Sequence, residues 1–280
     1  MKKEDIKGVQ AVLIGALPGK RLVILAGVHG NETCGIQAFE RVIPNIEIAR
    51  GTVTLVLGNP AAIEKNVRFV DANLNRMFRP DEELSKAMCS THEYRRSREL
   101  MPLLMEADAV LDIHSSGTRD TIPFAIASHK SLASAEALGF PLVSYGWDSI
   151  EPGGTDDFAE RYGAEGICIE CGHHEDPEAT ELAERSIYRF LALQGATDVA
   201  GTWTPPAPER RVRVNNVYKT MHDFSPAQMY RDFAPVQKGD IIGTDNGLAV
   251  NVPEDGVVIF VRERKGPGEE AFIFGTMVSL

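Results

Sequence analysis

The sequence predicts an α/β protein: a sandwich with a mostly parallel central sheet, followed by a small all-β domain at the carboxyl end. Up to about residue 195, short apolar runs alternate with helical patterns, which is the order found when helices cover a parallel sheet. After a proline-rich segment, the apolar runs become shorter and only turn sequences separate them. These two observations give the fold class.

The expected strands of the first part are apolar runs without alternation, and such runs suit strands buried on both faces of a sheet. They cover residues 10–14, 21–26, 53–57, 109–113, 124–127 and 167–170. A helix is expected over residues 81–107, because Pro80 and Asp81 match the preferences of a first helical turn. A second helix is expected over residues 177–196, where apolar residues recur at helical spacing.

The densest group of prolines lies at residues 201–209 and predicts a linker, because proline can extend neither a helix nor a central strand. It would separate a unit over residues 1–200 from a barrel-sandwich-like unit over residues 210–280. Strands of the second unit are expected at 211–214, 241–243 and 257–261, between turn sequences such as Asp245-Asn246-Gly247. Residues 252–258 resemble the hairpin of biotinyl and lipoyl carrier domains, but Glu254-Asp255 replaces the carrier lysine, so no carrier function is expected.

The composition is that of a soluble globular protein, with 280 residues, 43% of them hydrophobic and 25% charged. A formal net charge of -11 argues against nucleic-acid binding, which requires a basic surface. No amino-terminal targeting segment is recognisable, and no apolar run approaches the roughly 20 residues of a membrane span. We therefore expect a cytoplasmic protein that has no membrane or nucleic-acid partner and could form a homo-oligomer.

Three polar residues, each after an apolar run, form a candidate metal site. His29 and Glu32 follow the run at 21–26, and His114 follows the run at 109–113. Two imidazoles and one carboxylate are the ligands of a catalytic zinc whose fourth position stays open for water. In parallel sheets such residues gather at the carboxyl ends of the strands. Taken singly, the pair His29 and Glu32 could be a solvated pair at a helix start, and His114 could be structural.

Glu170 follows a third apolar run, and we expect it to be the general base that takes a proton from the water. The alternative is an ordinary charged residue at a strand end, but an unpaired carboxylate buried there would be costly. Asp112 points to the same side of its strand as His114 and could support that histidine.

The four cysteines are expected to be reduced and to have no catalytic role. Cys168 and Cys171 form a C-x-x-C pattern, which can mark a redox or a metal site. A redox motif would open a helix, whereas Cys168 lies inside an expected strand, and a structural zinc site would need a second pair. Neither function is therefore expected.

Four segments, in this order, resemble the succinylglutamate desuccinylase/aspartoacylase family. They are Gly27-Val28-His29-Gly30-Asn31-Glu32-Thr33, Asn73-Leu74-Asn75-Arg76-Met77-Phe78, Asp112-Ile113-His114 and Ile169-Glu170-Cys171-Gly172. The family belongs with the zinc carboxypeptidase-like hydrolases, so the resemblance implies a zinc-carboxypeptidase-like three-layer sandwich. It also implies one Zn2+ per chain and a small-molecule substrate.

The resemblance assigns substrate binding to Arg68, Asn75 and Arg76. An arginine can bind a carboxylate through two parallel hydrogen bonds, which suits Arg76, and Arg68 adds a fixed positive charge. Alternatively, all three could be surface residues of a charged loop. The chain departs from the family at Asn73, where many members have an aspartate, and a further family arginine has only an approximate counterpart in Arg161. No tyrosine follows Tyr230, although the family has a substrate-contacting tyrosine near its carboxyl end.

The function implied is a zinc-dependent amidohydrolase that cleaves the amide bond of an N-acylated amino acid, of the succinylglutamate or acetylaspartate type. A carboxypeptidase-like metallopeptidase is the alternative enzyme. A zinc-holding binding protein without turnover is the alternative outside enzymes, although such a protein would have no use for a base at Glu170.

Overall fold

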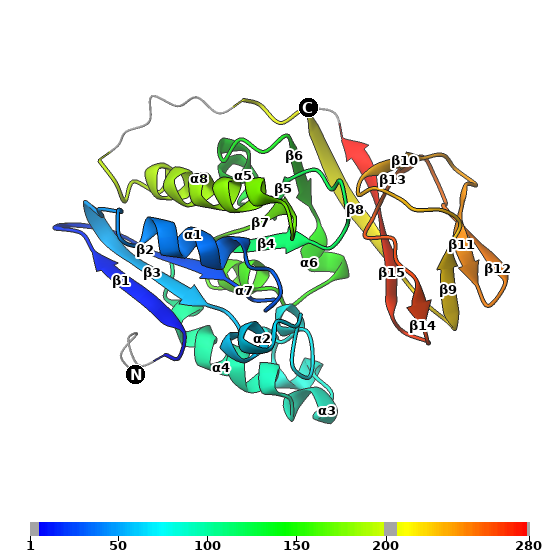
Figure 1. The fold of residues 1–280 in the computed structure, drawn as a ribbon, viewed down its shortest axis with the longest axis horizontal. Helices are drawn as coiled ribbons and strands as arrows, with labels where there is room; N and C mark the ends of the chain where they lie inside the picture. Colours follow the sequence, from blue (N-terminus) through cyan, green and yellow to red (C-terminus); the bar gives the residue numbers. More distant parts are fainter. Residues whose placement is uncertain (1–5, 199–205, 279–280) are drawn as a thin grey trace.

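The computed structural model describes residues 6–198 and 206–278 and contains a large sheet with helices on both faces (Figure 1). The strands of its first part are β1 (Val9–Ile14), β2 (Leu17–Ala26), β3 (Arg50–Leu57), β4 (Ala109–Ser116), β5 (Phe124–Ala127), β6 (Leu142–Tyr145) and β7 (Glu165–His173). Strands β3, β2, β4 and β7 lie side by side and run parallel, whereas β1 and β5 are antiparallel to their neighbours β3 and β7. The predicted mixed α/β fold with mostly parallel central strands is confirmed.

Two groups of helices cover the sheet. The helices are α1 (Cys34–Val42), α2 (Pro60–Lys65), α3 (Lys86–Cys89), α4 (His92–Met105), α5 (Leu132–Ala137), α6 (Trp147–Ile150), α7 (Thr155–Arg161) and α8 (Pro177–Leu193). Helices α1, α5 and α8 pack on one face, and α4 and α7 pack on the other. The likeness of this layering to zinc carboxypeptidases stays a prediction. Within the described residues, no helix is long and apolar enough to cross a membrane.

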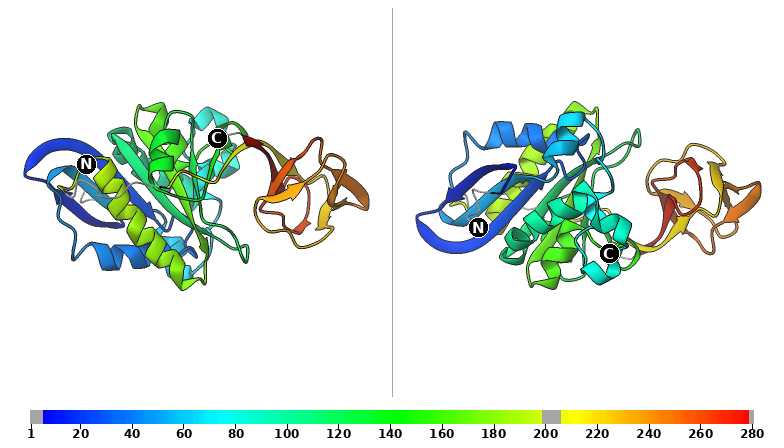
Figure 2. Two further views of the ribbon diagram at one scale, coloured as in Figure 1. Left: turned by 90° about the horizontal axis from the view of Figure 1, so that it is seen from above. Right: turned by 90° about the horizontal axis from the view of Figure 1, so that it is seen from below.

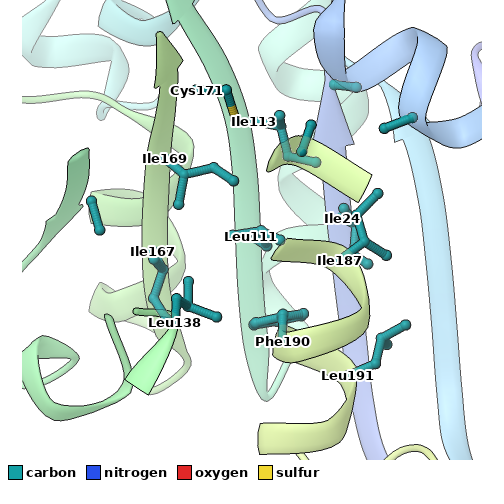
Figure 3. Close-up of a cluster of buried hydrophobic side chains, with 14 of the residues drawn as sticks. Ile24, Leu111, Ile113, Leu138, Ile167, Ile169, Cys171, Ile187, Phe190 and Leu191 are labelled. Carbon is teal, nitrogen blue, oxygen red and sulfur yellow. The ribbon is translucent and has the colours of Figure 1, made fainter. Parts of the chain in front are cut away.

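The central strands are buried on both faces, as their unbroken apolar sequences predict. Successive side chains of a strand point to opposite faces. Leu111 therefore packs under α8, whereas its neighbour Val110 belongs to the cluster under α4 and α7. Figure 3 shows the first cluster, in which Ile24, Leu111 and Ile169 from three strands meet Ile187 and Phe190 from α8.

The prediction of one helix over residues 81–107 is wrong. The segment contains the 3-10 turn η3 (Asp81–Glu83) and the separate helices α3 and α4. Ser85 and Thr91 cause the breaks, because each has an extended backbone and accepts a hydrogen bond from the N–H three residues later, at 3.2 and 3.1 Å. Each therefore caps the start of a new helix. The helix predicted over 177–196 is confirmed, although it ends at Leu193.

The carboxyl-terminal strands continue the large sheet. They are β8 (Arg210–Lys219), β9 (Asp223–Pro226), β10 (Ala234–Val236), β11 (Ile241–Asp245), β12 (Leu248–Asn251), β13 (Gly256–Ile259), β14 (Arg264–Lys265) and β15 (Glu270–Val278). Strand β8 pairs with β6 on one side and with β15 on the other, so a single sheet has the order β1-β3-β2-β4-β7-β5-β6-β8-β15-β13-β10. A second, antiparallel sheet has the order β12-β11-β9-β14. The four-residue strand β6, which joins the two parts, was not predicted.

The division of the chain at 201–209 stays a proposal, because residues 199–205 lie outside the described residues. Figure 2 shows the carboxyl-terminal strands, coloured yellow to red, beside the helix-covered part of the sheet. Asp232 joins the two parts. Its buried carboxylate accepts a hydrogen bond from Thr121 at 2.7 Å and one from the backbone N–H of Phe260 at 2.8 Å. Together, these two hydrogen bonds fix the segment after β13 against the loop after β4.

Candidate metal centre

The candidate ligands and Glu170 come from the carboxyl ends of three adjacent parallel strands. His29 and Glu32 follow β2, while His114 in β4 stands beside Glu170 in β7 as a register pair. Gly30 allows the first of these turns to pack tightly, because a Cβ at this residue would lie 2.1 Å from the backbone carbon of Ala62. The parallel register of the sheet therefore brings together residues that are far apart in sequence.

The donor atoms of His29, Glu32 and His114 converge. The Nδ1 atom of His29 lies 2.8 Å from one carboxylate oxygen of Glu32, and the Nδ1 atom of His114 lies 2.7 Å from the other. One donor atom from each residue lies within 4.8 Å of the others, and all three side chains are buried. These residues could therefore hold a metal ion.

The remaining ring nitrogens have partners that orient both imidazoles. The Nε2 atom of His29 lies 3.0 Å from Oδ1 of Asn73, and the Nε2 atom of His114 lies 3.0 Å from Oδ2 of Asp112. An N–H at each Nε2 would leave the lone pair of each Nδ1 available to a metal ion, and this is the tautomer that metal binding needs. Thr155 in turn donates a hydrogen bond to Asp112 at 2.5 Å. The histidine-supporting position expected for Asp112 agrees with this geometry, and Asn73 supplies the equivalent support for His29.

The charges of the three residues also suit a metal ligand set. Burial lowers the pKa of His29 to about 4, so its imidazole is neutral. Burial acts to raise the pKa of Glu32, but His29 and His114 outweigh it and hold that pKa well below the usual range. Burial likewise acts to lower the pKa of His114, whereas Asp112, Cys168 and Glu32 raise it well above the usual range. The centre thus contains an ionised carboxylate, and the field of Asp112 and Glu32 at His114 favours a positive charge.

Glu170 is placed to exchange a proton beside this centre. Burial, reinforced by the negative charge of Glu32, raises the pKa of Glu170 to about 8. Its Oε2 atom is buried and has no hydrogen-bond partner among the described residues. The side chain lines both a cavity of about 110 Å3 and a larger adjoining one of about 550 Å3. A buried carboxyl group with a free oxygen can accept and return a proton near neutral pH.

The three residues expected to bind substrate line the smaller cavity. The guanidinium of Arg68 donates to Glu32 at 3.0 Å, and the amide nitrogen of Asn75 lies 3.3 Å from Nε2 of His114. Arg76 already has carboxylate partners, because it forms an ion pair with the buried Glu151 and lies 3.6 Å from Glu270. Arg161 lies elsewhere, with Asp157 as its partner at 2.7 Å, and does not line either cavity.

Several residues of the cavity walls were not predicted. The smaller cavity is lined by acidic residues from α6, α7 and the turn between these helices, namely Asp148, Glu151, Asp156, Asp157 and Glu160. Trp147 and Phe260 line both cavities, and Arg262 and Arg264 line the larger one. No spacing rule relates these residues to the metal motif, because they reach the site through long-range packing of separate elements.

Asp156 lowers the stability of the folded protein as pH rises. Burial, together with the charge of Asp112, raises its pKa from 3.8 to about 7. A carboxyl group with a raised folded pKa binds more protons folded than unfolded, so this group lowers stability as pH rises from about 4 to about 7. We expect Asp156→Asn to be more stable than the parent by on the order of 1–2 kcal/mol at pH 8, and by less at pH 5.

Urea unfolding at both pH values, with a chelator in every sample, would measure this difference. The control is Asp157→Asn, whose carboxylate has Arg161 as its partner at 2.7 Å, so this variant should not gain stability as pH rises. A gain at Asp156→Asn that was equal at pH 5 and pH 8 would contradict the assigned cause.

The family model described as the succinylglutamate desuccinylase/aspartoacylase catalytic domain matches residues 18–194. The chain belongs to the succinylglutamate desuccinylase/aspartoacylase family. The matched residues include His29, Glu32, His114 and Glu170, whereas Arg262 lies outside them.

Curated relatives and solved structures agree with this family. The succinylglutamate desuccinylase of Shewanella sp. (strain MR-7) is 24% identical over 288 residues, covering 89% of this chain and 80% of the relative. That of Idiomarina loihiensis is 25% identical over 287 residues, covering 92% and 83%. Among solved structures, a succinylglutamate desuccinylase from Vibrio cholerae superposes with a TM-score of 0.79 at 20% identity, covering 97% of this chain and 86% of that one. A product-bound ectoine utilization protein EutE (DoeB) from Ruegeria pomeroyi superposes with a TM-score of 0.72 at 21% identity, covering 95% and 87%. These two likenesses show the shared fold.

Proposed function

We propose that this chain is a zinc-dependent hydrolase that cleaves the amide bond of an N-acylated amino acid. One observation carries the proposal: His29, Glu32 and His114 converge beside a buried carboxyl group, Glu170, in a single cavity. Membership of the family supports the same reaction type, since the curated relatives are named succinylglutamate desuccinylases. The substrate would be a small molecule.

In this proposal, His29, Glu32 and His114 would hold one Zn2+ per chain, and three protein ligands are the number found in catalytic zinc sites. Zinc at this site would supply Lewis-acid chemistry, because it lowers the pKa of water to about 7 and polarises a carbonyl group. Asn73 and Asp112 keep the two imidazoles in the ligand tautomer at hydrogen-bond distances of 3.0 Å.

Glu170 performs the proton transfers. Its free Oε2 takes the proton of the attacking water and passes it to the leaving amine nitrogen, so the carboxylate acts first as base and then as acid. A pKa of about 8 supports both steps, because near that pH the ionised form, which takes the proton, and the protonated form, which returns it, are both populated. Its position opposite His114 in the β4–β7 register places it next to the ligands without making it one of them.

Arg68, Asn75 and Arg76 are proposed to contact the substrate. The amide of Asn75 has a buried Oδ1 without a hydrogen-bond partner among the described residues, and this oxygen could accept a hydrogen bond from a substrate N–H. Arg68 stays beside Glu32 and adds positive charge close to the reacting carbonyl. Arg76 would have to exchange its carboxylate partners Glu151 and Glu270 for a carboxylate of the substrate.

The shape of the site favours a small substrate over a polypeptide. Arg262, Arg264 and Phe272 from the carboxyl-terminal strands line the larger cavity next to Glu32 and Glu170. Residues from both parts of the chain thus surround the place where an amide would lie, which disfavours a peptidase that threads a long chain. A binding protein without turnover would have no use for the carboxyl group of Glu170, whose Oε2 has no hydrogen-bond partner among the described residues.

The test is a hydrolysis screen over N-acetyl and N-succinyl amino acids with zinc-loaded protein. We expect the protein to release the free amino acid from at least one N-acyl amino acid of the panel. Elemental analysis should find one zinc per chain, and activity should be lost after chelation. Activity should return when zinc is added. Hydrolysis that persisted after the metal was removed would refute the metal-dependent mechanism, and absence of hydrolysis across the panel would refute the proposed reaction.

A further inference from the structure

The guanidinium of Arg262 differs in its pairing from the other arginines of the larger cavity. Four arginines line that cavity: Arg68, Arg76, Arg262 and Arg264. Three of them have a carboxylate within ion-pair distance, since Arg68 has Glu32 at 3.0 Å, Arg264 has Glu269 at 3.8 Å, and Arg76 has Glu151 and Glu270. Within residues 6–198 and 206–278, Arg262 has none.

Two acids, Asp232 and Glu170, act electrostatically on Arg262, and the stronger of the two effects comes from Asp232, which already has other partners. Asp232 acts on Arg262 electrostatically, but its carboxylate accepts hydrogen bonds from Thr121 and from the backbone of Phe260. Burial and the positive charge of Arg68 lower the pKa of Arg262. A partly desolvated guanidinium beside a second cation is unfavourable unless an anion binds between or beside them.

The backbone holds Arg262 in place rather than leaving it on a free loop. Its N–H donates to the carbonyl of Ala271 at 2.9 Å. Two residues earlier, Phe260 has a left-handed φ of 55°, a conformation that costs a non-glycine residue about 1 kcal/mol or more. The ring of Phe260 packs against Phe124 and Trp147, and its N–H is bound by Asp232. These contacts offset the strain and fix where the chain enters the cavity.

The guanidinium of Arg262 lies over the loop that follows the metal-ligand strand β4. One of its terminal nitrogens is 3.9 Å from the position that a Cβ on Gly117 would take, and its carbon is 5.5 Å from the centre of the Phe260 ring. Ser115, Ser116, Glu32 and Glu170 line the same cavity. Its volume of about 550 Å3 falls in the range of about 300–1,000 Å3 that holds small organic ligands, whereas the 110 Å3 cavity alone does not.

We propose that Arg262 binds the α-carboxylate of the substrate, a role that rests on the proposed N-acyl amino acid hydrolase function. The planar guanidinium can donate two parallel hydrogen bonds to a carboxylate without displacing an ion-pair partner among the described residues. Arg76 would have to give up Glu151 and Glu270 for the same purpose. The carboxyl-terminal strands would then contribute to substrate choice, although the ligands and Glu170 lie before residue 200.

The test compares ligands that differ only in this carboxylate. Binding of the best hydrolysed N-acyl amino acid and of its α-carboxamide would be measured by calorimetry, with zinc-loaded Glu170→Gln protein to prevent turnover. If nothing is hydrolysed, the probe is N-acetylaspartate and its α-carboxamide. We expect the acid to bind at least tenfold more tightly than the amide, and Arg262→Gln to remove most of this preference. Arg262→Lys should restore part of it, because the charge returns without the planar fork.

Arg264→Gln is the matched control, because Arg264 lies two residues away in the same cavity but has Glu269 as its own partner. This variant should keep the preference for the acid, and thermal melting should show that all variants are folded. Three results would overturn the proposal: no preference in the parent, an unchanged preference in Arg262→Gln, or equal losses in both variants. Turnover of the unmutated protein is scored separately, so failure of the hydrolase function and failure of the Arg262 assignment are distinguishable.

Discussion

Glu170→Gln is expected to lower kcat by roughly 10²–10⁴-fold, the range for loss of a general base, while zinc content stays at the parent level. Glutamine has nearly the same shape as glutamate but cannot take a proton from water. The change should spare the metal, because Glu170 is not one of the converging donors His29, Glu32 and His114. It should also spare the fold, since it removes a buried carboxyl group whose Oε2 has no hydrogen-bond partner among the described residues.

Steady-state kinetics together with elemental analysis of the same samples would decide this prediction. Glu160→Gln is a suitable control, because Glu160 also lines the smaller cavity but its carboxylate is engaged by the hydroxyl of Ser131 at 2.5 Å. We expect the control to lose at most a few-fold in kcat. Near-normal turnover in Glu170→Gln, with normal zinc, would mean that another group removes the proton.

The geometry of the candidate site follows from features that a sequence displays directly. His29, His114 and Glu170 each stand at the end of an apolar run, and parallel strands end at one edge of their sheet. Local rules therefore sufficed to place these residues together, with Glu32 one turn away from His29. Asp112 could be placed on the side of His114 because alternate residues of a strand share a face.

What the sequence could not show depends on contacts between distant segments. The pairing of Arg76 with Glu270 joins two segments that are distant in sequence, and no residue near Arg76 in the sequence indicates it. Arg262 reaches the cavity because β8 extends the central sheet through the short strand β6, which has too few residues to give a periodic signal. The break between α3 and α4 was missed for a different reason. The helical pattern of residues 81–107 was given more weight than the capping residue Thr91.

His114→Ala is expected to remove nearly all zinc from the protein after dialysis and to abolish turnover, while the chain stays folded. The variant takes away one of three donors, and the Nδ1 of His114 is the atom that faces the second oxygen of Glu32 at 2.7 Å. The fold should persist, because extensive apolar clusters on both faces of the sheet hold the strands without any contribution from the metal. In this variant Asp112 loses its partner at 3.0 Å but keeps the hydrogen bond from Thr155. We therefore expect the free energy of unfolding to fall by about a few kcal/mol. Each kcal/mol should lower Tm by roughly 2–4 °C.

His174→Ala provides the control for this experiment. His174 lies just after β7, and its Nδ1 is 2.8 Å from the hydroxyl of Ser115, so it is a histidine close to the centre that is not one of the converging donors. We expect this variant to retain about one zinc per chain. Elemental analysis, circular dichroism and thermal melting of both variants separate metal loss from unfolding. Zinc content that stayed at the parent level in His114→Ala would refute the ligand assignment, and equal zinc loss in both variants would show that the metal responds to general disturbance of this edge of the sheet.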